Sequence, residues 1–345
     1  MKLAKLELTQ FTVFQHAEFH FCPGINVLIG KNSTGKSHAL KAMYALLGGL
    51  AAAASSKAGE GKRDELTASK FESVFLPDQL DRLVRRPSAE PERGADILLT
   101  PEGGVDFAVT LSGNIVKVSP APPEPPPAIF LTSRDVLAIS EGFVELYDRR
   151  EISFDETYAD LSRALRLTRL RQTPEPLARI EKLLGGKVRL EGNRFYISLG
   201  AEEFEAHLVG EGLRKIATVA QLIANGSLMP GTILFWDEPE AGLNPQMIAH
   251  LAEFIRHLAA WGVQSFVATH DYLLSHRLSL AAGGEVEPRV PTRFFSLHRE
   301  SPDEPVEIEP GDTLEAIDNN PIVRAYADYY AYQRSLFAGS TGEGA

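Results

Sequence analysis

One octapeptide has the residue types and the spacing of a phosphate-binding loop. It is Gly30-Lys31-Asn32-Ser33-Thr34-Gly35-Lys36-Ser37. Glycines let backbone N–H groups wrap around phosphate oxygens, because no Cβ stands in the way. Lys36 is expected to reach the β- and γ-phosphates as a catalytic cation, and the hydroxyl of Ser37 is expected to ligate Mg²⁺. The segment therefore predicts a site for a nucleoside triphosphate.

Two later segments offer acids and a histidine to the same chemistry. The apolar run 232–236 ends at Asp237 and Glu238, and the run 264–268 is followed by Thr269 and His270. A buried strand that ends at an acid, in a chain with a phosphate loop, predicts a second Mg²⁺ ligand at Asp237. Glu238 is then placed to orient the attacking water, and His270 to contact the γ-phosphate, because parallel sheets gather their ligands at the carboxyl ends of strands. The alternative, that both acids only stabilise the start of the next helix, is the weaker one beside a phosphate loop.

The elements that must position these residues indicate an α/β fold with a largely parallel core sheet. Strands are expected at 25–29, 128–131, 232–236, 264–268 and 293–297, and helices at 38–50, 71–86, 211–224, 245–260 and 313–337, the last with a break at Pro321. An antiparallel pair is expected at 2–10 and 17–21, short strands within 95–118, and a hairpin at 188–190 and 195–199.

The chain divides into segments of different composition. The nucleotide-binding α/β lobe is expected to comprise 1–50 and 186–300 together with 128–135, and 136–185 is expected to form a helical lobe. Residues 51–127 look like an insertion, with a mobile start at 51–70, a polar loop at 87–94 and a proline-rich spacer at 119–127. Residues 301–345 are expected to form a helical tail, disordered from 339.

Composition limits the class of protein. The chain has 345 residues, 44% of them hydrophobic, and one cysteine, Cys22, which fits a reducing compartment. No stretch has the length and apolarity of a signal peptide core or a membrane span, so we expect a cytoplasmic protein without a membrane partner. A formal net charge of −11 argues against wholesale wrapping by nucleic acid, but leaves room for a local basic face.

Taken in order, these motifs resemble those of ABC-type ATPases. Residues 30–37 look like a Walker A motif, 235–238 like a Walker B motif with its catalytic glutamate, 241–245 like a D-loop, and His270 like the switch histidine. The sequence Asp-Glu-Pro-Glu-Ala-Gly-Leu-Asn-Pro at 237–245 most resembles that of the SMC- and RecF-like branch of AAA-type ATPases, which includes overcoming-lysogenization-defect-like proteins. The resemblance implies the fold of a P-loop NTPase with an ABC-type head.

The same resemblance implies a homodimer with ATP between two heads. A signature loop of one head would then cap the γ-phosphate held by the other. Residues 209–215 lie where that loop is expected, so Gly210, Glu211 and Gly212 are candidate ATP contacts. The chain departs from the pattern in three ways: Gly210 replaces the usual serine, no glutamine follows Leu131, and no basic residue stands in 10–14.

A basic run lies in the expected helical lobe. Residues 163–189 hold eight basic residues and two acids, and Arg163, Arg166 and Arg169 recur at helical spacing. A solvated amphipathic face is the commoner meaning of such a run, and a contact with the DNA backbone is the alternative. A cluster of tyrosines in the last helix is expected to be core or a partner-binding surface: Tyr326, Tyr329, Tyr330 and Tyr332.

The expected activity is ATP hydrolysis that drives a conformational change, in DNA repair or phage defence. A separate, nuclease-like effector protein is a candidate partner, because no acids outside the ATP site show metal-ligand spacing in the sequence. The main alternative is the nucleotide-binding subunit of a membrane transporter, which the missing glutamine disfavours. A GTP-binding switch is weaker still, since the chain has no Asn-Lys-x-Asp element.

Overall fold

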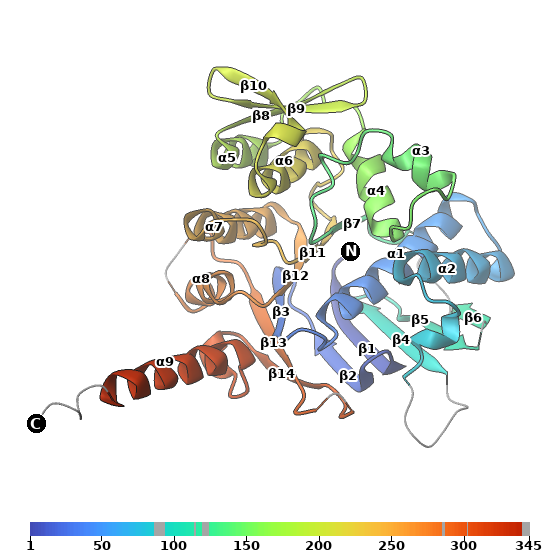
Figure 1. Cartoon of the computed structure of the whole chain (residues 1–345). Helices are drawn as coiled ribbons and strands as arrows, with labels where there is room; N and C mark the ends of the chain where they lie inside the picture. The colour runs from blue at the N-terminus through green and yellow to red at the C-terminus, as the bar shows by residue number, and fades with distance from the viewer. Residues whose placement is uncertain (86–93, 114, 119–123, 285–286, 302, 340–345) are drawn as a thin grey trace, which may run out of the picture.

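The computed structural model describes residues 1–85, 94–113, 115–118, 124–284, 287–301 and 303–339. Its central sheet has the strand order β14-β13-β3-β12-β11-β7 (Figure 1). The strands are β3 (Ile25–Gly30), β7 (Ala128–Leu131), β11 (Ile233–Asp237), β12 (Gln264–Thr269), β13 (Thr292–His298) and β14 (Glu307–Gly311). Neighbours pair in parallel except β14, which runs antiparallel to β13. The expected parallel core is confirmed, and it brings the carboxyl ends of β3, β11 and β12 to one edge.

A second, antiparallel sheet covers one face of the central sheet. Its order is β2-β1-β4-β5-β6, with β1 (Leu3–Phe11), β2 (Phe14–His20), β4 (Ala95–Pro101), β5 (Phe107–Ser112) and β6 (Ile115–Val118). The helix α1 (Lys36–Ser55) lies with it, and a shared core includes Leu8 of β1, Met43 of α1 and Phe235 of β11. Because the other face is covered as well, β3 and β12 are buried at every position, which explains their continuous apolar runs.

Helices cover the opposite face of the central sheet. They are α6 (Glu211–Ala224), α7 (Pro245–Trp261) and α8 (Tyr272–Gly283), and α8 was not expected from the sequence. Their side chains share a core with Val27 and Trp236 of the sheet. Beside α6 lie α5 (Glu175–Leu184) and α4 (Glu156–Leu165), with α3 (Phe143–Asp148) next to α4, in the upper half of Figure 1. The expected hairpin at 188–199 is β8 (Gly186–Glu191) and β9 (Arg194–Leu199), extended by β10 (Glu202–Glu205) and the short η2 (Ala206–Leu208).

Two expectations for the region after α1 are wrong. Residues 51–70 are helical rather than mobile, since α1 continues to Ser55 and α2 spans Glu60–Phe75, followed by η1 (Leu80–Leu83). Gly49 is the point where the two helices meet, because a Cβ there would lie 2.7 Å from the Cα of Thr67. Nor does 51–127 form a separate insertion, because β4 pairs directly with β1, with Leu8 opposite Ile97. The polar loop at 87–94 and the spacer at 119–127 lie largely outside the described residues.

The last segment differs from the expected helical tail. It begins with β14 and with η3 (Leu314–Ala316), and α9 spans Pro321–Gly339. Pro321 starts the helix instead of breaking it, as proline does at a first helical position. The side chain of Asn320 accepts hydrogen bonds from the N–H groups of Ile322 and Val323, which caps the helix. Disorder was expected from 339, but Gly339 is the last residue of α9, and the rest of the expected stretch, 340–345, lies outside the described residues.

Candidate nucleotide-binding site

The phosphate loop joins the carboxyl end of β3 to the start of α1. Two of its residues have positive φ, Ser33 at 63° and Gly35 at 92°. A Cβ on Gly35 would lie 2.6 Å from side-chain atoms of Val13 and Phe14, so only glycine fits between the loop and the β1–β2 turn. The described residues that line the hollow over this loop are Val13, Asn32, Ser33, Thr34, Gly35, Lys36, Ser37, His38, Glu238 and Arg299.

Lys36 lies inside the loop. Only 7% of the residue is exposed, and its Nζ donates to the carbonyls of Gly30 at 2.8 Å and Lys31 at 2.9 Å. Burial lowers the pKa of Lys36, while the negative charge of Asp237 opposes this shift. The ammonium is therefore held against two carbonyl oxygens of the loop.

Ser37 and Asp237 are brought together from α1 and β11. The hydroxyl of Ser37 donates to Oδ1 of Asp237 over 3.0 Å. Burial raises the pKa of Asp237, and the hydrogen bond from Ser37 works against that rise. A hydroxyl beside a buried carboxylate is a hard oxygen donor set, which suits Mg²⁺. These two residues fit the ion that the sequence predicts for them.

Glu238 and His270 also meet at this edge of the sheet. Nδ1 of His270 lies 3.2 Å from Oε1 of Glu238. Glu238 has a φ of 48°, and its backbone N–H donates to the carbonyl of Ala268 at 2.9 Å. The left-handed conformation turns the chain at the end of β11, so that the side chain of Glu238 lines the hollow beside the phosphate loop.

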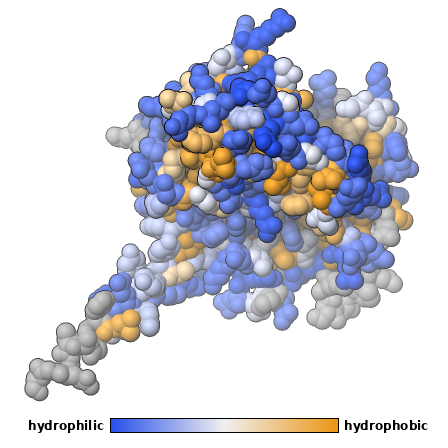
Figure 2. Space-filling view, turned by 45° about the horizontal axis from the view of Figure 1, so that its top comes forward, coloured by the Kyte–Doolittle hydropathy of each residue, from blue (hydrophilic) through white to orange (hydrophobic). Residues whose placement is uncertain are grey.

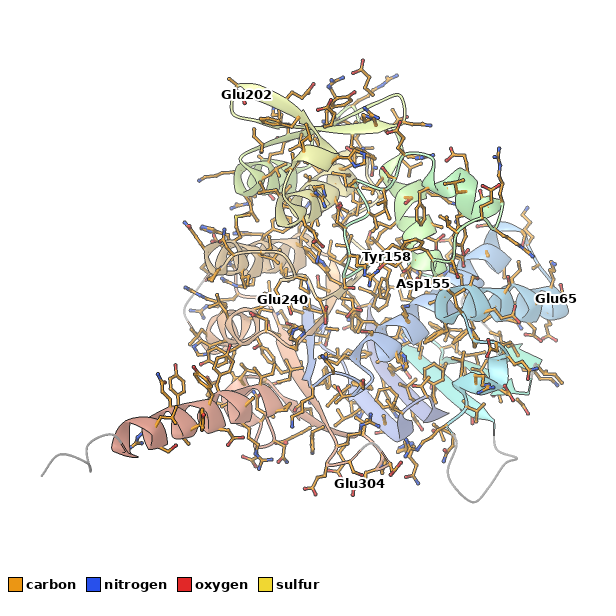
Figure 3. All side chains as sticks on the ribbon, in the orientation of Figure 1. Glu65, Asp155, Tyr158, Glu202, Glu240 and Glu304 are labelled. Carbon is orange, nitrogen blue, oxygen red and sulfur yellow. The ribbon has the colours of Figure 1, made fainter. Side chains whose placement is uncertain are left out.

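Glu240 is a buried acid that sequence reasoning missed. Its side chain is labelled in Figure 3. Its Oε1 accepts a 2.6 Å hydrogen bond from the hydroxyl of Thr269 and lies 4.0 Å from Nδ1 of His270. Burial raises the pKa of Glu240, and the bond from Thr269 opposes the rise. The sequence holds a weak signal, a third acid directly after Asp237, Glu238 and Pro239, but nothing local says that this acid is buried.

The expected signature loop lies apart from the hollow. Gly210, Glu211 and Gly212 stand at the start of α6, and none of them is among the described residues that line the hollow. A Cβ on Gly212 would lie 2.5 Å from the carbonyl oxygen of Gly242, so the loop packs on the D-loop segment of its own chain.

The turn after β7 is tied to the start of α6. Nε of Arg214 lies 2.6 Å from Oδ2 of Asp135, whose side chain is 4% exposed. Arg214 also donates to the carbonyl of Val209, directly before the loop. Sequence reasoning noted the missing glutamine in this turn but missed the ion pair that occupies it.

Comparison with known proteins gives a consistent family. Two AAA families match: "AAA ATPase domain" over residues 1–82, and "AAA domain, putative AbiEii toxin, Type IV TA system" over residues 112–275. The solved structure of the SmcHead bound to the C-winged helix domain of ScpA is similar over 91% of this chain and 98% of that chain, with a TM-score of 0.58 and 14% identity. The chain thus matches AAA-family P-loop ATPase domains and has the fold of an SMC head.

Curated relatives match over shorter stretches. The arginine transport ATP-binding protein ArtP of Escherichia coli (strain K12) is 30% identical over 97 residues, which are 28% of this chain and 35% of that protein. The DNA replication and repair protein RecF of Limosilactobacillus reuteri (strain DSM 20016) is 48% identical over 46 residues, 13% of this chain and 12% of RecF. The chain thus spans about a third or less of the length of these relatives.

The expected basic face of this SMC-like head is neutralised by acids from other segments. Arg163 pairs with Asp148 at 2.6 Å and Asp160 at 3.1 Å, and Arg166 pairs with Glu145 at 2.9 Å. Arg169 lies past the end of α4, 3.6 Å from Glu181. The two acids within 163–189 underestimate the negative charge near the arginines, because Glu145, Asp148 and Asp160 also form ion pairs with them. The arrangement favours a paired, solvated face over an electropositive one.

The tyrosines of α9 are exposed rather than core. The exposed fractions are 47% for Tyr326 and 61% for each of Tyr329, Tyr330 and Tyr332. The helix projects from the body of the head in Figures 1 and 2. Of the two expectations for these side chains, core is wrong, and a partner-binding surface remains a prediction. In the part of the chain that the structure describes, no helix has the length and apolarity that crossing a membrane requires.

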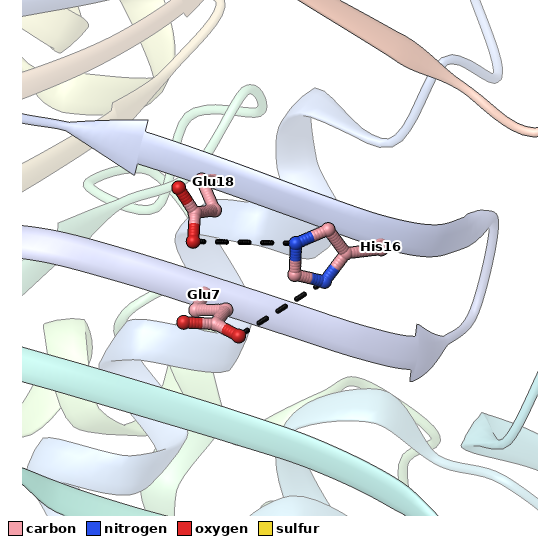
Figure 4. Close-up of side chains that lie close together, drawn as sticks. All are labelled: Glu7, His16 and Glu18. Carbon is pink, nitrogen blue, oxygen red and sulfur yellow. Dashed lines mark ion pairs between the residues drawn. The ribbon is translucent and has the colours of Figure 1, made fainter.

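A cluster on the outer face of β1 and β2 has metal-ligand types that the sequence did not reveal. The ring nitrogens of His16 lie 4.0 Å from Glu7 and 4.0 Å from Glu18 (Figure 4). The ammonium of Lys5 lies 3.0 Å from Glu7 and 2.9 Å from Glu18. Because a lysine already neutralises both carboxylates, we assign no metal to this cluster.

Proposed function

We propose that this chain binds ATP with Mg²⁺ and hydrolyses it. The observation that supports this best is the meeting of two pairs at one edge of the central sheet, Ser37 with Asp237 and Glu238 with His270. Ser37 and Asp237 would hold the metal ion, which when bound neutralises phosphate charge. Lys36 would bind the β- and γ-phosphates inside the loop.

Glu238 would orient the attacking water and His270 would contact the γ-phosphate. The contact of 3.2 Å between the carboxylate of Glu238 and the imidazole of His270 supports these roles, because water positioning requires an oriented carboxylate. Glu240 and Thr269 brace this pair from the buried side. The water would then attack the γ-phosphorus in line with the leaving oxygen, releasing ADP and phosphate.

The working unit we propose is a homodimer with ATP between two copies. The signature residues Gly210 and Glu211 are exposed and do not line the hollow of their own chain, among the residues described. The start of an α-helix presents N–H donors to an anion, so α6 of a second copy is suited to cap the bound γ-phosphate. The chain would act in the cytoplasm, as its single cysteine suggests.

The process we propose is DNA repair or phage defence, with a separate effector protein. The name of the relative RecF supports the first, and the toxin–antitoxin wording of one matching family supports the second. Pull-downs of the full chain in ATP and in ADP would identify the effector. Recovery of a nuclease-like protein in one nucleotide state supports the proposal, and recovery of no protein in either state contradicts it.

The direct test compares the wild type with Glu238→Gln. We expect phosphate release with Mg²⁺-ATP from the wild type, loss of at least about a hundredfold in the variant, and a dimer in gel filtration when the variant holds ATP. The control is Glu253→Gln, an exposed acid on α7 away from the hollow. No ATP-dependent release from the wild type would refute hydrolysis, and an unchanged elution volume with ATP would refute the dimer.

A second candidate is the nucleotide-binding subunit of a transporter, which the match to ArtP favours. The turn after β7 argues against it, because Asp135 pairs there with Arg214 and no glutamine is present. Co-sedimentation of the native protein with membranes would favour the transporter, and recovery in the supernatant would favour the first proposal.

A further inference from the structure

Arg299 stands beside the phosphate loop on the side that the proposed chemistry does not use. β13 runs parallel to β3, with Leu297 opposite Gly30, and Arg299 follows the end of that strand. β12, on the other side of β3, delivers His270 in the same way. The two neighbours of β3 therefore place one polar side chain each at the edge where the phosphate loop begins.

The guanidinium of Arg299 contacts the loop itself. Its Nη2 donates to the carbonyl of Ser33 over 2.8 Å, at the loop position with a φ of 63°. The residue lines the same hollow as Val13, Lys36 and Glu238. It also lines a neighbouring polar cavity of about 900 Å³ that reaches from Lys31 to Arg324 on α9.

The charges of the residues that line the hollow indicate what Arg299 could bind there. Among the described lining residues, Lys36 and Arg299 carry positive charge and Glu238 carries negative charge. His38 is no substitute, because burial lowers the pKa of its ring and so keeps it neutral. The β1–β2 turn contributes Val13, which has no charge to offer. Among these described lining residues, Arg299 is therefore the cation besides Lys36 that a polyphosphate chain in the hollow could meet.

We infer that Arg299 is a second cationic nucleotide-binding residue, which contacts the phosphate chain from the β13 side. A guanidinium presents N–H donors in a fixed plane and can hold a loop carbonyl and phosphate oxygens together. Because Glu238 and His270 come from β11 and β12, a contact from β13 acts on binding rather than on attack at the γ-phosphate. The binding of ADP and the binding of ATP should therefore depend on Arg299 to a similar extent. The inference rests on the proposed nucleotide site.

The test measures affinity and turnover separately. Calorimetry with Mg²⁺-ADP should show binding to Arg299→Ala weakened about ten- to a hundredfold, as expected for loss of a charge-assisted hydrogen bond. Arg299→Lys keeps the charge but not the planar fork, so its affinity for Mg²⁺-ADP should lie between those of Arg299→Ala and the wild type. At saturating ATP the turnover number should stay at the wild-type value while KM rises.

The matched control is Arg289→Ala, which removes an exposed arginine before the other end of β13. Thermal unfolding without nucleotide checks that each variant folds, and Arg299→Lys carries the test if the alanine variant does not. Wild-type ADP affinity in a folded Arg299 variant overturns the inference, and so does a fall in turnover number at unchanged KM. If the wild type itself binds neither ADP nor ATP, the proposed nucleotide site is wrong, which is a distinct result.

Discussion

Arg214→Ala should destabilise this head strongly, because it leaves a buried carboxylate without its counter-charge. Nε of Arg214 lies 2.6 Å from Oδ2 of Asp135, and the side chains are 18% and 4% exposed. Removing one partner of a buried ion pair costs about 3–5 kcal/mol. The N–H of Leu137 still donates to Asp135 at 3.1 Å, which offsets part of the loss. We therefore expect a fall of about 3 kcal/mol in the free energy of unfolding.

Urea unfolding of Arg214→Ala, Asp135→Ala and the double variant would measure this pair. The double-mutant cycle should give an interaction energy of about 1–3 kcal/mol. Arg189→Ala is the matched control, because it breaks an exposed pair with Glu203, which should contribute at most about 1 kcal/mol. A cost below about 1 kcal/mol for Arg214→Ala, with additive single variants, would refute the burial argument.

Two further predictions concern a buried acid and an exposed helix. Burial raises the pKa of Glu240 above its unfolded value, so its contribution to stability is fully present at low pH and is lost as the pH rises through the folded-state pKa. In thermal unfolding, Glu240→Gln should therefore gain stability relative to the wild type as the pH rises from the ordinary value of 4.5 through the higher folded-state pKa, and a difference that is constant with pH would contradict this. Tyr329→Ser and Tyr330→Ser should each change the free energy of unfolding by less than about 0.5 kcal/mol, since both side chains are 61% exposed. A loss above about 2 kcal/mol in urea unfolding would place them in a core.

The parts of the site that the sequence predicts are those with local causes. Apolar runs followed by glycine, acid or histidine identify the ends of β3, β11 and β12, because a parallel strand buried on both faces has no polar alternation. A parallel sheet then brings those ends together whatever the loops between them do. For this reason the sequence alone suffices to pair Ser37 with Asp237, although the two residues are far apart along the chain.

The parts that the sequence does not predict depend on long-range packing. Asp135 and Arg214 meet only after β7 and α6 are both in place, and Arg299 is next to Ser33 only because β13 lies beside β3. The error over 51–127 has the same origin. The sequence of β4 does not reveal that its partner is β1. The segment 51–127 was therefore interpreted as an insertion between two parts of the core.

Other long-range contacts connect the two halves of the proposed composite site within one chain. Lys41 and Tyr44 of α1, the helix that carries Lys36 and Ser37, bond to Asp155 and Asp160 of the α4 segment at 2.8 Å and 2.7 Å. Figure 3 shows Asp155 beside α1, at the start of α4.

The signature residues stand at the start of α6. Gln221 of α6 donates to the carbonyl of Leu165 at 3.0 Å, and Asn225, directly after α6, donates to that of Ala164 at 2.8 Å. Both acceptors lie in the last turn of α4. The helix α4 is therefore bonded near its start to α1, which carries the phosphate-loop residues, and at its end to α6, which begins with the signature residues. A shift of α1 on binding nucleotide would then have to move α4, and with it α6, or break polar contacts that are largely shielded from water. The surface offered to a second copy would therefore depend on whether the phosphate loop of the first holds nucleotide.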